Sequence, residues 1–209
     1  GLTNAGAAET ARVLAQLDIP EDRFLLTSIF GASLDEFVAV ARALAPYSDG
    51  LELNLSCPHA KGYGMAIGQD PELVQAITAA VKTAVDIPVI PKLTPNTQDI
   101  GRIARAAVNG GADAICAINT LGPGYYSAHG HPVLSKEHGG LSGKGVLPSG
   151  LKCVREIRAA GECPIIGCGG ISAAEDVEAY RNAGASVFGV GSALVGLDSP
   201  QMAQYFSAL

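Results

Sequence analysis

The stretch PIIGCGGISAAEDVEAYRNAGASVFGVGS, residues 164–192, decides the fold because it places a helix-forming segment between two apolar runs. The first run leads into Gly169-Gly170, and the second leads into Gly191-Ser192. This order predicts two parallel strands joined by a right-handed helical crossover. Glycines after such strands let backbone N–H groups approach an anion, and a helix N-terminus adds a favourable dipole. We therefore expect a phosphate site at these four residues, the alternative being that the glycines serve only tight turns.

The same alternation of strand and helix runs along the whole chain. Strands are predicted at residues 23–30, 51–55, 89–93, 113–118, 164–167 and 186–190. Helices are predicted at residues 7–17, 34–45 with Ser33 as N-cap, 70–85, 97–109, 147–160, 172–182 and 200–209. Residues 121–144 are expected to form a long glycine-rich loop.

Six successive βα units predict an α/β fold with a parallel sheet. Polar or glycine residues fall at the carboxyl ends of the predicted strands: Ser28, Asn54, Lys92, Asn119, Gly169 and Gly191. A TIM (β/α)8 barrel gathers all these ends on one face, whereas an open sheet gathers only those near its switch point. We therefore expect a barrel that lacks its first two strands in this chain, with residues 1–209 forming one N-terminally incomplete domain.

The composition excludes several classes of protein. The 209 residues carry a net charge of −6 without a basic run, which argues against nucleic-acid binding. No apolar stretch is long enough to cross a bilayer, so a cytoplasmic protein that does not bind membranes is expected. Five irregularly spaced cysteines and no CxxC pair argue against a disulfide framework and against a metal site.

Three further candidate groups follow predicted strands. Asn54 ends one strand, and its amide can bond the imide edge of a pyrimidine ring. Cys57 lies in the polar turn behind it, a position typical of a partly exposed, reactive thiol, although an inert loop cysteine would fit equally. Lys92 ends an apolar strand and needs a partner there, such as an anionic or electron-rich cofactor, unless it reaches solvent. Asn119 and Thr120 end the next strand; the alternative for Asn119 is a simple turn role.

Five motifs occur in the order and spacing of a known family. They are Asn-Leu-Ser-Cys-Pro (54–58), Pro-Lys-Leu-Thr-Pro-Asn (91–96), Ile-Asn-Thr-Leu (118–121), Gly-Gly-Leu-Ser-Gly (139–143) and Gly-Cys-Gly-Gly-Ile (167–171). From Gly1 to about Leu194 the chain resembles the flavin barrel of class 1 dihydroorotate dehydrogenases. It is also similar to the pyrimidine-reducing domain of dihydropyrimidine dehydrogenase.

This resemblance implies FMN as cofactor and assigns roles to individual residues. The FMN-binding residues that it implies are Ser28, Asn54, Lys92, Ile118, Gly143, Gly169, Gly170, Gly191 and Ser192. The pyrimidine-binding residues that it implies are Gly1, Leu2, Asn54, Asn119 and Thr120. Cys57 is implied as the base that removes the C5 proton of dihydroorotate while C6 gives a hydride to the flavin. Lys92 would balance negative charge on the reduced flavin.

The expected function is FMN-dependent oxidation of dihydroorotate to orotate in de novo pyrimidine biosynthesis. His59 stands where dihydroorotate dehydrogenases usually have Asn, which favours dihydropyrimidine dehydrogenase-type reduction of uracil or thymine as an alternative. Gly-Gly-Leu-Ser-Gly instead favours the dihydroorotate enzymes that partner an FAD/iron–sulfur electron-transfer subunit, as a homodimer or heterotetramer. A non-catalytic flavin-binding barrel and a phosphate-binding lyase or isomerase remain as further alternatives, and the sequence does not define the electron acceptor.

Overall fold

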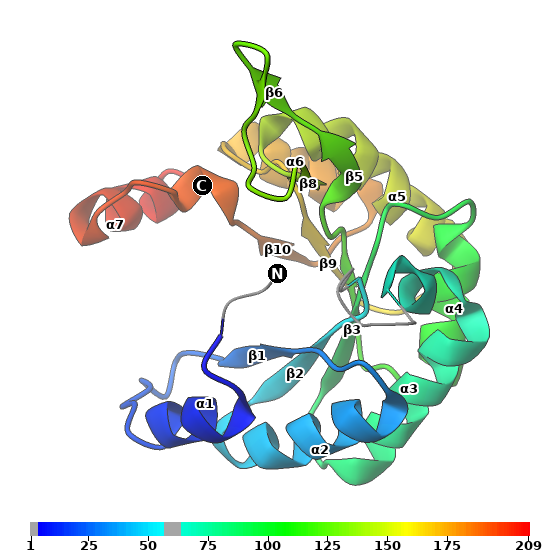
Figure 1. The fold of residues 1–209 in the computed structure, drawn as a ribbon. Coiled ribbons are helices and arrows are strands. Elements are labelled where there is room, and N and C mark those ends of the chain that lie inside the picture. Colours follow the sequence, from blue (N-terminus) through cyan, green and yellow to red (C-terminus); the bar gives the residue numbers. More distant parts are fainter. Residues whose placement is uncertain (1–3, 57–63) are drawn as a thin grey trace. The chain divides into compact units, whose positions relative to one another are not determined.

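Strands and helices alternate along the chain in the computed structural model, which describes residues 4–56 and 64–209 (Figure 1). The described residues form two compact units. The first unit holds the residues up to Leu93 together with Arg102–Cys116, and the second holds Thr94–Gly101 and Ala117–Leu209.

The first unit alternates strands and helices as the sequence predicts. Its elements are α1 (Ala7–Leu14), β1 (Leu26–Ile29), α2 (Leu34–Leu44), η1 (Ala45–Tyr47), β2 (Gly50–Asn54), η2 (Gly64–Gln69), α3 (Pro71–Ala84), β3 (Val89–Leu93), most of α4 (Ile100–Asn109) and the start of β4 (Ile115–Ala117). β1 pairs with β2 in parallel, and β2 pairs with β3 in parallel. The expected parallel sheet is therefore confirmed in this unit.

The two faces of β1–β3 differ in polarity, because successive side chains of a strand point to opposite sides. Leu51, Leu53, Val89 and Leu93 are fully buried on one face. Helices α2 and α3 pack against this side of the sheet, with Phe37 of α2 also fully buried. The opposite face carries the polar residues of the candidate site.

Local capping explains where α2 begins. The Oγ atom of Ser33 accepts a hydrogen bond from the backbone N–H of Glu36 at 3.2 Å, which confirms Ser33 as the N-cap. The Glu36 carboxylate accepts from the N–H of Ala32 rather than closing the box on Ser33. The start of the helix is thus fixed by two side chains within one turn.

The second unit contains the stretch that predicted the fold. β9 (Ile165–Cys168), α6 (Ala174–Ala183) and β10 (Val187–Gly189) follow one another, and β9 pairs with β10 in parallel. The unit also holds η3 (Lys144–Val146), α5 (Leu147–Ala160), η4 (Ser192–Leu194) and α7 (Ser199–Ser207). The strand–helix–strand prediction is therefore confirmed.

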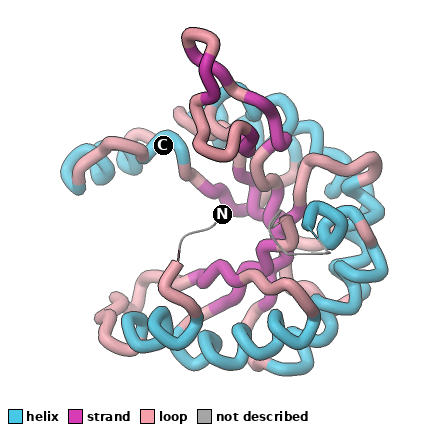
Figure 2. The backbone as a smooth tube through the Cα atoms, in the orientation of Figure 1, coloured by secondary structure: helices cyan, strands magenta, loops and turns pink. Residues whose placement is uncertain are grey.

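The prediction of a long glycine-rich loop at residues 121–144 is wrong in that the segment contains strands. This segment forms two antiparallel pairs, β5 (Leu121–Tyr125) with β8 (His138–Leu141) and β6 (Ser127–Ala128) with β7 (His131–Pro132), drawn in magenta in Figure 2. His129 and Gly130 connect β6 to β7, and both have positive φ. Two central residues with positive φ suit a tight hairpin turn, so the local glycine here closes a hairpin.

Two helix starts also differ from the prediction. The helix predicted at residues 172–182 begins at Ala174, because Ala173 occupies the N-cap and Asp176 accepts from the backbone N–H groups of Ser172 and Ala173. Helix α4 begins at Ile100 instead of residue 97. The preceding residues stay outside the helix because the side chain of Asn96 is hydrogen-bonded to the backbone of Thr120 and Gly122.

Candidate functional site

In the first unit, a polar cluster occupies one face of β1–β3. Ser28, Glu52 and Lys92 come from three neighbouring strands, and Ser28 lies in register with Glu52. The Oγ atom of Ser28 donates to Oε1 of Glu52 at 2.8 Å. The Nζ atom of Lys92 lies 3.4 Å from the same Oε1 atom. The structure therefore brings the predicted residues Ser28 and Lys92 together through Glu52.

Glu52 is a functional candidate that the sequence analysis did not single out. Its side chain is 10% exposed and that of Lys92 is 26% exposed. A buried carboxylate is expected to be paired, because desolvation of an isolated charge is costly. A charged residue inside an apolar strand, two positions before Asn54 on the same face, was the signal that could have revealed it.

Asn54 ends β2 on the same face as this cluster and lies in register with Lys92. Its Oδ1 atom accepts from the backbone N–H of Ser56 at 3.2 Å, which closes a short side-chain turn. This contact fixes the amide at the carboxyl end of the strand. Cys57, Gly1, Leu2 and His59, to which the sequence analysis also gave roles, lie outside the described residues.

In the second unit, Asn96 holds the segment that carries Asn119 and Thr120. Its Nδ2 atom donates to the carbonyl oxygen of Thr120 at 3.1 Å, and its Oδ1 atom accepts from the N–H of Gly122 at 2.9 Å. Asn119 itself accepts from the N–H of Thr120 at 2.8 Å. Both predicted pyrimidine ligands thus lie on a backbone segment that a side-chain amide holds at two points.

The predicted phosphate residues of the second unit lie together. A Cβ atom on Gly170 would lie 2.9 Å from the carbonyl oxygen of Gly143 and 2.8 Å from the backbone nitrogen of Leu147. Gly143, Gly169 and Gly170 all have positive φ, which favours glycine. The hydroxyl of Ser192 is hydrogen-bonded to that of Ser142 at 2.9 Å. We call Gly143, Gly169, Gly170, Gly191 and Ser192 the glycine cradle.

Tyr180 fixes the turn on the β9 side of the cradle. Its hydroxyl lies 3.0 Å from the carbonyl oxygen of Cys168 and 2.8 Å from that of Gly169, and the residue is fully buried. The backbone N–H of Ile118, another predicted cofactor ligand, donates to the Cys168 carbonyl at 2.8 Å. The turn that follows β9 is therefore held from two sides.

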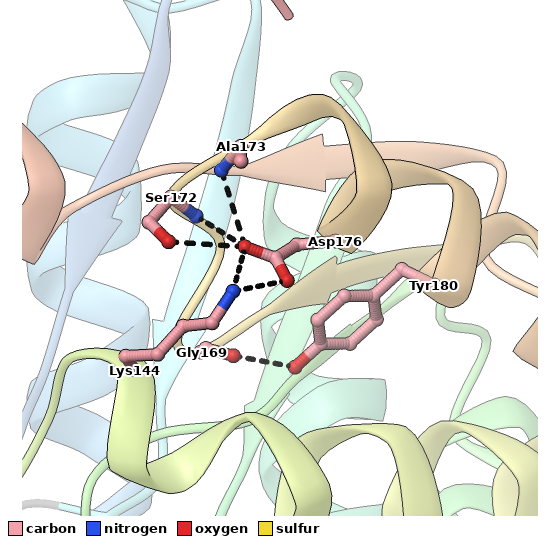
Figure 3. Close-up of polar contacts among 6 residues, drawn as sticks. All are labelled: Lys144, Gly169, Ser172, Ala173, Asp176 and Tyr180. Carbon is pink, nitrogen blue, oxygen red and sulfur yellow. Dashed lines mark hydrogen bonds and ion pairs between the residues drawn. The ribbon is translucent and has the colours of Figure 1, made fainter.

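An ion pair lies beside the cradle. Figure 3 shows the Nζ atom of Lys144 against both carboxylate oxygens of Asp176, at 2.5 and 2.6 Å. Asp176 also accepts from the backbone N–H of Ser172 at 2.9 Å and from its hydroxyl at 3.0 Å. Its side chain is 6% exposed, whereas that of Lys144 is 59% exposed. One buried carboxylate thus connects the residue after Gly143 with the turn after Gly170.

The electrostatic balance of this pair favours the ionised carboxylate. Burial opposes ionisation of Asp176, but the hydrogen bonds from Lys144 and Ser172 outweigh it, so the pKa of Asp176 lies below its usual value. Burial raises the pKa of Tyr205 in α7, and the Asp176 charge raises it further. The Tyr205 hydroxyl is buried and has no hydrogen-bond partner among the described residues.

Each of the two units, taken by itself, offers a different kind of binding surface. The cradle offers backbone surface without side chains, as a phosphate requires. The cluster of Ser28, Glu52 and Lys92 offers a cation and hydrogen-bonding groups, as a polar heterocycle requires. Within residues 4–56 and 64–209, no group of three potential metal ligands comes together.

Four further residues were not predicted as functional from the sequence, besides Glu52: Asn96, Lys144, Asp176 and Tyr180. Asn96 ends the motif at residues 91–96 and Lys144 directly follows the motif at residues 139–143, so their neighbouring residues were a local signal. Their partners lie far away in the sequence and gave no local signal. Among the described helices, none combines the length and hydropathy that crossing a bilayer demands.

Comparisons with known proteins agree with this geometry. The family model described as dihydroorotate dehydrogenase matches residues 1–205. A protein named dihydroorotate dehydrogenase B (NAD(+)), catalytic subunit, from Methanosarcina acetivorans is 52% identical over 172 residues, covering 81% of this chain and 55% of its own length. The protein of the same name from Methanothermobacter thermautotrophicus is 39% identical over 224 residues, covering all of this chain and 73% of its own length.

A solved structure shares the fold. The crystal structure of DHODH in complex with ferulenol from Eimeria tenella matches with a TM-score of 0.74 at 21% identity, over 95% of this chain and 60% of that one. This similarity supports the expected barrel class, whereas the two further strands stay a prediction. The chain spans a little over half the length of several of the relatives that it matches.

Proposed function

Because this chain belongs to the dihydroorotate dehydrogenase family, we propose that it is the FMN-binding catalytic part of an enzyme that oxidises dihydroorotate to orotate. The observation that carries the proposal is the glycine cradle. The carbonyl oxygen of Gly143 lies so close to Gly170 that a Cβ atom at residue 170 would clash with it. Oxidation removes a proton from C5 and a hydride from C6, which leaves the C5=C6 double bond of orotate. When bound, FMN supplies the acceptor for the hydride.

The residues of the chain would divide the remaining work. Asn54, Asn119 and Thr120 would bind the pyrimidine ring through its amide groups. Cys57 would remove the C5 proton as thiolate, the role of a general base. Lys92, partly neutralised by Glu52 at 3.4 Å, would face the flavin ring and balance negative charge. Gly143, Gly169, Gly170, Gly191 and Ser192 would hold the phosphate, with Ser28 and Ile118 as further cofactor contacts.

The partner and the location belong to the same proposal. The archaeal relatives are named as catalytic subunits of an NAD(+)-linked enzyme. We therefore expect the protein to act in the cytoplasm, either in a heterotetramer with an FAD/iron–sulfur subunit that passes electrons onward or as a homodimer without that subunit.

Anaerobic spectroscopy of the full-length protein tests the function. The purified protein should show a flavin spectrum, and dihydroorotate should bleach it, while dihydrouracil and dihydrothymine leave it unchanged. Bleaching by dihydrouracil or dihydrothymine would instead assign the dihydropyrimidine dehydrogenase activity that His59 favours. Bound flavin that no substrate bleaches would indicate a non-catalytic barrel, and a protein without flavin would point to a phosphate-binding lyase or isomerase.

The role of Cys57 has its own test. Cys57→Ala should lose turnover by at least about a hundredfold, the usual contribution of a positioned base, while FMN stays bound. Cys57→Ser should retain part of the rate at high pH. A hydroxyl is less acidic than a thiol, so the deprotonated form that acts as the base is available only at higher pH. Steady-state rates and the flavin content of both variants give the comparison; full activity of the alanine variant would refute the assignment.

A further inference from the structure

We propose that Lys144 is a positioning residue for the phosphate group of the bound cofactor, acting through Asp176. The inference rests on the proposed function, since it concerns the anion that the glycine cradle would hold. It assigns a role to an exposed lysine and a buried aspartate that lie beside the cradle and that the reaction itself does not use.

The contacts of Asp176 connect the two sides of the cradle. On one side its carboxylate accepts from the backbone N–H groups of Ser172 and Ala173, at 2.9 and 3.1 Å, two and three residues after Gly170. On the other side it accepts from Lys144, the residue after Gly143. Figure 3 shows these contacts converging on one carboxylate. The ion pair therefore ties together two chain segments that must approach each other closely.

The spacing of these segments leaves little tolerance. The Gly143 carbonyl and the Leu147 nitrogen lie within 2.9 Å of the point where a Cβ atom on Gly170 would sit. A phosphate held by backbone N–H groups from both segments would bind best when their separation is fixed beforehand, because ordering them on binding costs free energy. Lys144 would provide this fixation without occupying the cradle.

Charge gives a second reason. The Asp176 carboxylate is almost fully buried next to the turn that would face the phosphate. Without a neighbouring cation, its negative charge would repel a phosphate dianion across a medium of low dielectric constant. The Lys144 ammonium, in contact with both carboxylate oxygens, cancels this charge. Lys144 thus makes a buried acid compatible with an anion site.

Binding of two flavins that differ only in the phosphate tests the proposal. The full-length protein is stripped of cofactor and titrated with FMN and with riboflavin, using flavin fluorescence. Lys144→Met should weaken FMN binding by about tenfold or more, which corresponds to about 1.4 kcal/mol. Riboflavin affinity should change by less than about twofold, since riboflavin lacks the phosphate whose site Lys144 would position. Lys144→Arg should restore most of the FMN affinity, because it keeps the cation.

Lys152→Met is the matched control. Lys152 lies in α5, in the same unit, and its side chain is 72% exposed and paired with Glu156 at 2.9 Å. The variant removes the same charge without touching Asp176, so it should bind both flavins like the wild type. Thermal unfolding of each apo variant checks that the folds are equally stable.

The outcomes separate this inference from the proposed function. Unchanged FMN affinity in Lys144→Met, or an equal loss for FMN and riboflavin, would overturn the role of Lys144 and leave the flavin enzyme intact. If Lys152→Met weakened FMN binding as much as Lys144→Met does, the loss would be explained by the change in net charge of the protein. This result would also overturn the role of Lys144. A wild-type protein that binds neither flavin would overturn the proposed function, and the inference with it.

Discussion

Asp176 accepts hydrogen bonds from three residues beside the glycine cradle. It accepts from Lys144, from the Ser172 hydroxyl and from two backbone N–H groups at the start of α6. These backbone groups would otherwise lack an intrahelical partner. The residue therefore acts at once as a helix cap and as the anion of an ion pair.

The first prediction concerns the pH dependence of this cap. The pKa of Asp176 is lowered in the folded protein, so its contribution to stability is present above the unfolded pKa of about 3.9 and is lost as the pH falls through the folded value. Asp176→Asn should cost about 2 kcal/mol at neutral pH. The difference from the wild type should shrink in acid below about pH 4. Urea unfolding of both proteins at several pH values measures it; a difference that stays constant would contradict the assignment.

At the scale of elements, close packing between two helices, rather than helix propensity, explains why α5 contains a glycine. Gly150 lies inside helix α5, where alanine is normally more stable than glycine by about 1 kcal/mol. A Cβ atom at this position would lie 1.8 Å from the Tyr180 hydroxyl, which holds the turn after β9. The helix α5 therefore needs glycine to admit the tyrosine of α6.

The second prediction follows from this contact. Gly150→Ala should destabilise the protein by about 1–3 kcal/mol, the usual cost of overpacking, despite the higher helix propensity of alanine. Gly145→Ala is the control, because nothing lies within 4 Å of its Cβ position. Adding Tyr180→Phe to Gly150→Ala should recover part of the loss, because the clashing oxygen is gone. Denaturant midpoints of the single and double variants give the comparison. If the stability changes of Gly150→Ala and Tyr180→Phe simply add in the double variant, the two residues do not interact as described.

At the scale of the whole molecule, the family assignment extends over residues 1–205, whereas several relatives are nearly twice as long as the part that they share. Ligand binding offers a global readout that does not depend on catalysis. A ligand that binds only the folded protein stabilises it by RT ln(1 + [L]/Kd).

The third prediction uses this linkage on the full-length protein. FMN at a concentration of about a hundred times its Kd should add about 2.7 kcal/mol to the free energy of unfolding. Riboflavin at the same concentration should add less, because it lacks the phosphate that the glycine cradle would hold. Thermal unfolding with each flavin measures the difference. Equal shifts for both flavins would show that the cradle does not recognise phosphate.

The sequence determined the order of the elements and the family. The apolar run at 89–93 became β3, the segment 147–160 became α5, and Ser33 caps α2, because these features depend on periods and caps within a few residues. The glycine turn after β9 was equally predictable, since Gly169 and Gly170 have positive φ, which favours glycine.

Only the tertiary structure decided which polar groups meet. The paired residues are far apart in the sequence. Lys92 and Glu52 are separated by 40 positions, Lys144 and Asp176 by 32, and Asn96 and Gly122 by 26. Such pairs depend on strand register and on the packing of helix ends, which no short window of sequence encodes. The hairpins within residues 121–144 belong here as well, because glycine-rich segments give no periodic signal and acquire their pairing from antiparallel contacts.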